Sequence, residues 1–148
     1  MIIGVVLRNF KTYKPITFLP ISNGEKFCGL IGENGIGKSS ILESLDFFFN
    51  DKQFKKNINS TGSEEEYYVV PIFAIEKDLI EDPNIREIAE KYSTNIWAII
   101  NEDIKSPTFN YKYLDTLKSI SEHIESLNGA IAQESHYLLP VGEAYWLV

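Results

Sequence analysis

Three glycines followed by a lysine and a serine mark the part of the sequence that could do chemistry. Residues 32–39 read GENGIGKS, with glycines at positions 32, 35 and 37. A glycine has no Cβ, so a loop with this spacing can turn several backbone N–H groups toward one bound anion. A helix that begins near Lys38 would add the positive end of its dipole. The segment therefore predicts a phosphate-binding loop (P-loop) for a nucleoside triphosphate, with ATP as the expected ligand.

Side chains at the end of this loop would supply the charge and the metal chemistry. Lys38 is expected to reach the β- and γ-phosphates, which also makes it the candidate catalytic residue. The hydroxyl of Ser39 is the candidate ligand of a Mg²⁺ ion that bridges the same phosphates. Ser40 is a further candidate donor to the α-phosphate. The predicted nucleotide-binding residues of the loop are Gly32, Glu33, Asn34, Gly35, Ile36, Gly37, Lys38, Ser39 and Ser40.

The elements around the loop are those that a P-loop needs. Apolar, β-branched residues 2–10 and 16–21 predict two strands joined by a turn, and residues 26–31 predict a buried strand directly before the loop. From Lys38, apolar residues recur at a spacing of three and four, so a helix should end near residues 50–51. Its buried face is expected to contain Ile41, Leu42, Leu45, Phe48 and Phe49. The sequence thus predicts an α/β fold with a mixed β-sheet.

The remaining chain predicts further strands and helices. Residues 51–66 are polar and without a period, which indicates a surface loop, and residues 67–75 predict a strand in which Pro71 must occupy an edge or a bulge. Residues 85–92 predict a short helix, and residues 95–101 predict another strand. A longer helical segment is expected at about residues 108–128, ending at Asn128-Gly129. The apolar residues 145–148 end the chain without a polar tail, so we expect residues 1–148 to be a fragment of a longer protein.

Two segments resemble a known group of ATPases. GENGIGKSS followed by ILESL resembles the Walker A segment of ABC-type ATPase heads of the SMC, RecF, RecN and OLD group, and residues 9–13 (NFKTY) resemble the turn after their first strand. The likeness implies that residues 1–148 are the N-terminal portion of such a head, with Lys11 and Thr12 beside the nucleotide. It also implies ATP-driven self-association of two heads that controls a nucleic-acid-directed activity. OLD-like ATPases of bacterial anti-phage systems, including retron-associated ones, look closest.

Other parts of such a head are missing from the sequence. No apolar strand ends in the Asp-Glu pair of a Walker B motif, because residues 101–103 read Asn-Glu-Asp, and no signature segment rich in Ser and Gly is visible. Gln133 is either a candidate for the glutamine loop or a residue on the surface of a helix. Hydrolysis needs a positioned water and stabilisation of the transferred phosphoryl group. We therefore expect ATP hydrolysis in a full-length protein and little in residues 1–148 alone.

Charge and composition limit the other sites. The net charge is −7, but residues 1–60 hold eight Lys or Arg against five Asp or Glu, so an anion should bind in this part. Lysines and a phenylalanine at residues 52–56 fit either a nucleic-acid backbone or a solvated loop. Cys28 fits a buried strand, and His123 and His136 lack metal-ligand neighbours. No stretch is apolar enough for a membrane span and no signal peptide is visible, so a cytoplasmic address is expected.

Two other functions fit a P-loop. A small-molecule kinase uses the same loop, although such kinases usually place it after their first strand, whereas two predicted strands precede it here. A non-hydrolysing module would use bound nucleotide only to hold its shape and bind a partner. Phosphoryl transfer to an acceptor would identify the kinase, and function retained without the Lys38 ammonium would identify the module.

Overall fold

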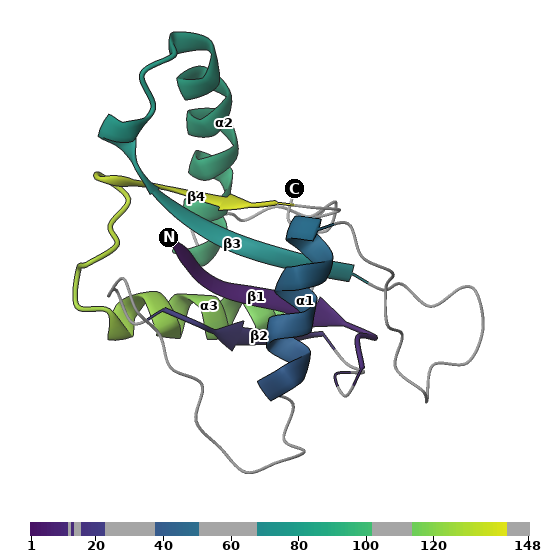
Figure 1. The fold of residues 1–148 in the computed structure, drawn as a ribbon. Coiled ribbons are helices and arrows are strands. Elements are labelled where there is room, and N and C mark those ends of the chain that lie inside the picture. Colours follow the sequence, from purple (N-terminus) through teal and green to yellow (C-terminus); the bar gives the residue numbers. More distant parts are fainter. Residues whose placement is uncertain (12, 14–15, 23–37, 51–67, 102–113, 142–148) are drawn as a thin grey trace.

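A four-stranded sheet forms the centre of the computed structural model, which describes residues 1–11, 13, 16–22, 38–50, 68–101 and 114–141 (Figure 1). The strands are β1 (Ile2–Arg8), β2 (Thr17–Pro20), β3 (Tyr68–Glu76) and β4 (His136–Pro140), and they lie in the order β2-β1-β3-β4. All three pairings are antiparallel. The strands expected within residues 2–10, 16–21 and 67–75 are therefore confirmed. The expected strand at residues 26–31 and the expected loop at residues 51–66 lie outside the described residues, and no parallel pairing occurs among the strands that are described.

The inner strands contribute to two separate cores because successive side chains of a strand point to opposite faces of the sheet. Val5 and Leu7 of β1 pack with Val69 of β3 on one face. Val6 and Val70 pack on the other face. All five side chains are buried, so both faces of the inner strands are covered.

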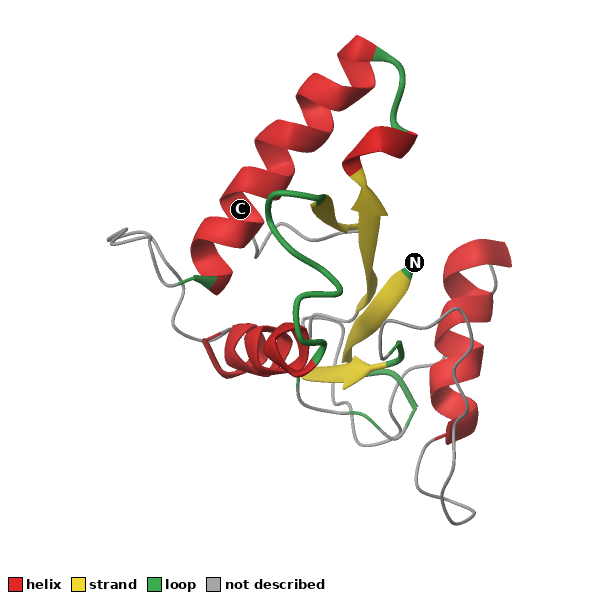
Figure 2. Ribbon diagram, turned by 90° about the vertical axis from the view of Figure 1, so that its left-hand side faces the viewer, coloured by secondary structure: helices red, strands yellow, loops and turns green. Residues whose placement is uncertain are grey.

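Helices cover both faces of the sheet (Figure 2). The helix α1 (Lys38–Asn50) packs against one face, and α2 (Pro83–Ile100) and α3 (Leu114–Ser126) pack against the other. A single 3-10 turn, η1 (Lys77–Leu79), joins β3 to α2. The result is an α/β arrangement of three layers, in which α1 has one side of the sheet to itself among the described elements.

The predicted extent of α1 is confirmed, but its predicted buried face is partly wrong. Ile41 is buried, whereas Leu42 and Phe49 are 61% and 58% exposed. The inner face instead includes Ser44, which is fully buried and donates its hydroxyl hydrogen bond to the carbonyl of Ile41 at 2.6 Å. A buried serine that bonds to its own helix loses no hydrogen bond, so an apolar pattern alone could not identify this face.

The strand predicted at residues 95–101 is wrong, because α2 continues as one helix to Ile100. Ala89, Ser93, Ile96, Trp97 and Ile100 recur at a spacing of three or four residues and are all buried. This is the spacing of one helix face. Burial of that face against the sheet therefore overrides the preference of the isoleucines and the tryptophan for strands.

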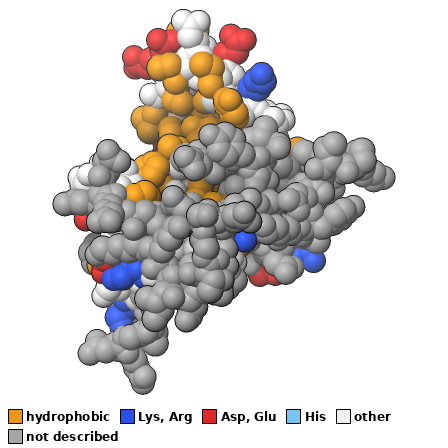
Figure 3. All heavy atoms as spheres, turned by 90° about the vertical axis from the view of Figure 1, so that its right-hand side faces the viewer, with side chains coloured by type: hydrophobic (Ala, Val, Ile, Leu, Met, Phe, Trp, Pro, Cys, Tyr) orange, Lys and Arg blue, Asp and Glu red, His pale blue; other side chains and the backbone are white. Residues whose placement is uncertain are grey.

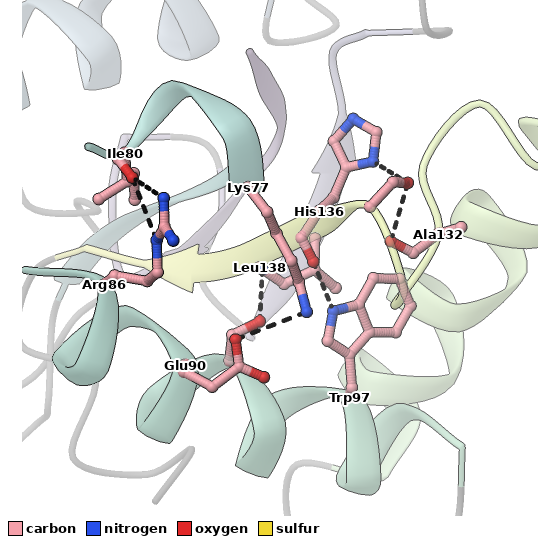
Figure 4. Close-up of polar contacts among 10 residues, drawn as sticks. Lys77, Ile80, Arg86, Glu90, Trp97, Ala132, His136 and Leu138 are labelled. Atoms are coloured by element: carbon pink, nitrogen blue, oxygen red, sulfur yellow. Dashed lines mark hydrogen bonds and ion pairs between the residues drawn. The ribbon is translucent and has the colours of Figure 1, made fainter. Parts of the chain in front are cut away.

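Side chains of α2 are tied to the backbone of β4 (Figure 4). The hydroxyl of Ser93 accepts a hydrogen bond from the N–H of Leu138 at 2.9 Å, and the indole N–H of Trp97 donates to the carbonyl of His136 at 3.2 Å. Other polar contacts in this region join Arg86 to the carbonyl of Ile80, Lys77 to the carboxylate of Glu90, and the hydroxyl of Ser135 to the imidazole of His136. The contacts of Ser93 and Trp97 fix α2 relative to β4, a strand that lies far from it in the sequence.

The outer part of α2 projects from the sheet and carries apolar side chains (Figures 1 and 3). Ile85, Ile88 and Tyr92 are 55%, 58% and 49% exposed. Their spacing places them on one face of the helix, beside the buried face. The apolar side of α2 is therefore wider than the part that the sheet covers.

Pro71 lies in β3, an inner strand, so the prediction of an edge or a bulge for this residue is wrong. The carbonyl of Pro71 accepts a hydrogen bond from the N–H of Val141 at 3.0 Å. A residue in an antiparallel strand directs its N–H and C=O to the same neighbour, so the donor that proline lacks would also face Val141. Because β4 ends at Pro140, the N–H that Pro71 lacks would lie just past the end of the hydrogen-bonded ladder between β3 and β4.

The helix α3 and its end are confirmed. Ile120, Ile124 and Leu127 are buried, as the spacing predicts. After Ser126 the chain leaves the helix through Asn128 and Gly129, with φ angles of 51° and 81°. This left-handed conformation is a common helix terminator. Residues 108–113 and the side chains of Leu114 and Leu117 lie outside the described part.

Candidate phosphate-binding site

The helix α1 begins at Lys38, immediately after the glycines of GENGIG. Its first turn contains no acidic residue, so no carboxylate there opposes the partial positive charge of the helix N-terminus. Lys38 is half-buried, Ser39 is exposed and Ser40 is buried. An ammonium and an accessible hydroxyl at a helix N-terminus fit a magnesium-bound triphosphate. The predicted loop residues 32–37 lie outside the described part of the chain.

A tight turn follows β1 and packs against α1. The backbone N–H of Phe10 donates to the carbonyl of Tyr13 at 3.0 Å, and the N–H of Tyr13 donates to the carbonyl of Phe10 at 2.9 Å. Asn9 and Lys11 have φ angles of 51° and 48°, a region that residues other than glycine rarely adopt. Phe10 is buried, and its ring centre lies 6.5 Å from that of Phe47 in α1. The turn, with its left-handed residues, therefore packs directly against α1.

An ion pair joins this turn to α1. The ammonium of Lys11 donates a hydrogen bond to the carboxylate of Glu43 at 2.6 Å, and both side chains are 31% exposed. A pair with this exposure adds up to about 1 kcal/mol of stability in water. The structure therefore brings the turn at residues 9–13 against the helix that begins at Lys38. Thr12, the other residue of the turn predicted to lie beside the nucleotide, is outside the described part.

Burial raises the pKa of Tyr13 above that of an ordinary tyrosine. Removal of water disfavours the charged phenolate, so the hydroxyl of Tyr13 stays neutral at physiological pH. The turn therefore contributes the positive charge of Lys11 and no phenolate charge to this side of α1.

Glu43 belongs to this region, although no motif of the sequence identifies it. It lies four residues after Ser39, and that spacing puts the two side chains on the same face of α1. Two features of the sequence point to this contact. One is a carboxylate one helical turn after Ser39, and the other is a lysine in the turn at residues 9–13. Neither feature alone shows that two segments 32 residues apart in the sequence meet.

The other candidate residues lie away from α1 or outside the described part. Gln133 is exposed in the turn before β4, not on a helix, and its side-chain oxygen accepts a hydrogen bond from the amide of Asn101 at 3.2 Å. His123 contacts the carbonyl of Ser22 at 2.7 Å through Nε2. Among the described residues, no group of three His, Cys, Asp or Glu side chains could hold a metal ion. Cys28 and the basic residues 52–56 are not in the described ranges.

Comparison with known proteins gives one result. A family model described as the AAA ATPase domain matches residues 1–139. This range contains the glycine loop, the turn after β1 and every described helix. No curated protein and no solved structure gave a match. Within the described ranges, no helix is both long enough and apolar enough to cross a membrane.

Proposed function

The chain belongs to the AAA ATPase domain family, and from this membership we propose that it binds ATP with Mg²⁺ through residues 32–40. The observation that carries the proposal is the start of α1 at Lys38, directly after a glycine loop and without an acidic residue in its first turn. The dipole of a 13-residue helix and the Lys38 ammonium then act on the same anion.

The backbone and the side chains of residues 32–40 have different tasks in this proposal. The backbone N–H groups of residues 32–37 surround the phosphates, and Lys38 neutralises the charge of the β- and γ-phosphates. Ser39 presents its hydroxyl to Mg²⁺, in line with its exposure, and Ser40 donates to the α-phosphate. The bound metal would supply electrostatic stabilisation of the phosphoryl group during hydrolysis.

We further propose that residues 1–148 are the N-terminal portion of an ABC-type head of the SMC, RecF and OLD group. In this proposal ATP drives two heads together and controls a nucleic-acid-directed activity, as in anti-phage defence. The support is that the two segments that carry the resemblance, residues 9–13 and the P-loop helix, contact each other through Lys11 and Glu43 and through Phe10 and Phe47.

Isothermal titration calorimetry with ATP and MgCl₂ tests the binding proposal. Lys38→Ala should weaken ATP binding roughly 10- to 100-fold, because a charged hydrogen bond contributes about 1.5–3 kcal/mol. Lys118→Ala is the matched control, because Lys118 is an exposed lysine on α3, on the opposite face of the sheet. Equal affinities of the wild type and the Lys38→Ala variant would reject the site.

Two assays distinguish an ATPase head from a small-molecule kinase and from a non-hydrolysing module. Sedimentation velocity with ATP and with ADP should show self-association with ATP only, and the Lys38→Ala variant should stay monomeric. Phosphoryl transfer from ATP to a small-molecule acceptor would favour a kinase instead. Self-association that survives the loss of the Lys38 ammonium would favour a module that uses nucleotide only to hold its shape.

A further inference from the structure

The Lys11–Glu43 ion pair lies close to the residue proposed to hold Mg²⁺. Glu43 follows Ser39 by four residues on α1, which corresponds to a rise of about 6 Å along the helix and to nearly the same direction around it. Side chains on a helix lean toward its N-terminus, so the Glu43 carboxylate leans toward Ser39. The Lys11 ammonium, 2.6 Å from that carboxylate, is therefore expected on the Ser39 side of the helix.

The backbone of the turn restricts where the Lys11 side chain can go. Lys11 itself has a φ of 48°, and the two hydrogen bonds between Phe10 and Tyr13 close the turn around it. Phe10 is buried against α1, so the turn does not pivot freely on the helix. The remaining freedom lies in the four-carbon stem of the lysine, whose end is held by Glu43.

We propose that Glu43 is a positioning residue that holds the Lys11 ammonium beside the terminal phosphate, so that the pair distinguishes a nucleoside triphosphate from a diphosphate. The inference rests on the proposed function of residues 32–40. An ammonium has three N–H donors, so it can hold a carboxylate and a phosphate oxygen at the same time. Ser39 would hold the Mg²⁺ of a bound triphosphate, and the Lys11 ammonium, on the same side of α1, would act on the terminal phosphate. Holding a long side chain in its binding position before the ligand arrives favours binding, because its freedom is already lost.

The affinities for ATP and for ADP of three variants test this role. Glu43→Gln should raise the Kd for ATP about threefold to fivefold and leave the Kd for ADP unchanged, since the pair acts on the terminal phosphate. Lys11→Met should raise the Kd for ATP about tenfold. The double variant should behave like Lys11→Met alone, because Glu43 acts only through Lys11. Lys118→Met is the matched control for the loss of an exposed lysine.

A charge-swapped variant, Lys11→Glu with Glu43→Lys, separates positioning from a purely structural role. It can rebuild the ion pair, so its melting temperature should stay near that of the wild type. It also turns a carboxylate toward the phosphates, so its ATP affinity should fall below that of Lys11→Met. Wild-type ATP affinity in the swapped variant, or equal effects of Glu43→Gln on ATP and ADP, would overturn the inference.

The same measurements distinguish a failure of this inference from a failure of the proposed function. If the wild type does not bind ATP, or Lys38→Ala binds it equally well, the phosphate site itself is rejected, and the inference fails with it. If Lys38→Ala loses binding while Glu43→Gln keeps its preference for ATP, only the role of Glu43 is rejected.

Discussion

The hydroxyl of Ser93 on α2 accepts the backbone N–H of Leu138 in β4 at 2.9 Å, and both residues are buried. β4 is the last strand of the described sheet, and this bond attaches it to a helix that begins more than fifty positions earlier in the chain. A small polar side chain thus satisfies a donor of the sheet inside the main core.

Ser93→Ala should lower the free energy of unfolding by about 1–3 kcal/mol, because the N–H of Leu138 would stay buried without an acceptor. Urea denaturation measures the change. Ser135→Ala is the control, since the Ser135 hydroxyl is exposed and its loss should change stability by less than about 0.5 kcal/mol. Equal effects of the two substitutions would contradict the assigned role of Ser93.

Gly4→Ala should also destabilise the sheet, at the point where β1 meets β2. A Cβ at position 4 would collide with the ring of Phe18 and would lie 2.8 Å from the backbone oxygen of Leu19. Overpacking of this kind costs about 1–3 kcal/mol. The double variant Gly4→Ala, Phe18→Leu relieves only the contact with the ring, so it should stay less stable than Phe18→Leu alone. Thermal unfolding followed by circular dichroism would decide this.

The end of α3 offers a matched pair of substitutions. Gly129→Ala should cost about 1 kcal/mol, because alanine is strained at a φ of 81° although the space around it is open. Asn128→Gly, at a φ of 51°, should change stability by less than about 0.5 kcal/mol, because glycine adopts that conformation readily. Chemical denaturation of both variants tests the contrast, and a larger loss for Asn128→Gly would speak against the assigned cap.

Tyr137 should make the fold sensitive to alkaline pH. Burial raises its pKa above the ordinary 10.0, and the hydrogen bond and negative charge of Glu90 raise it further. The neutral form is therefore favoured in the folded state, and its contribution to stability is complete below pH 10.0 and is lost as the pH rises through the folded-state pKa. Melting temperatures between pH 8 and 11 should fall less steeply for Tyr137→Phe than for the wild type. Part of the fall should remain, because burial raises the pKa of Tyr13 as well. Parallel curves for the two proteins would show that Tyr137 does not contribute.

The positions of elements with a regular apolar period could be predicted from the sequence, but the buried roles of individual serines could not. β1, α1 and α3 occur where the spacing of apolar residues predicts them. For the region of α2 the sequence predicts a helix at residues 85–92 and a strand at residues 95–101, whereas the structure has one helix. Ser93 is in fact buried and bonded to β4, a relationship between distant segments that a local pattern does not contain.

The candidate site shows the same limit. Lys38 and Ser39 follow from the spacing of the glycines, since the chemistry of phosphate binding dictates that spacing. The contact between Lys11 and Glu43 depends instead on how the sheet packs against α1. Lys11 has a left-handed backbone, which orients its side chain. A glycine would have indicated this conformation in the sequence, but position 11 is a lysine.

Pro71 has a consequence for the fidelity of strand pairing. A slip of β3 by one residue against its neighbours would turn every side chain to the opposite face and direct the proline nitrogen toward β1. A carbonyl of β1 would then be buried in the sheet without a donor, at a cost of about 1–3 kcal/mol in addition to the lost packing. The native alignment avoids this cost because the missing donor faces Val141, beyond the last residue of β4. Pro71 therefore raises the free energy of sheets in which β3 pairs out of register, and this favours the native register while the chain folds.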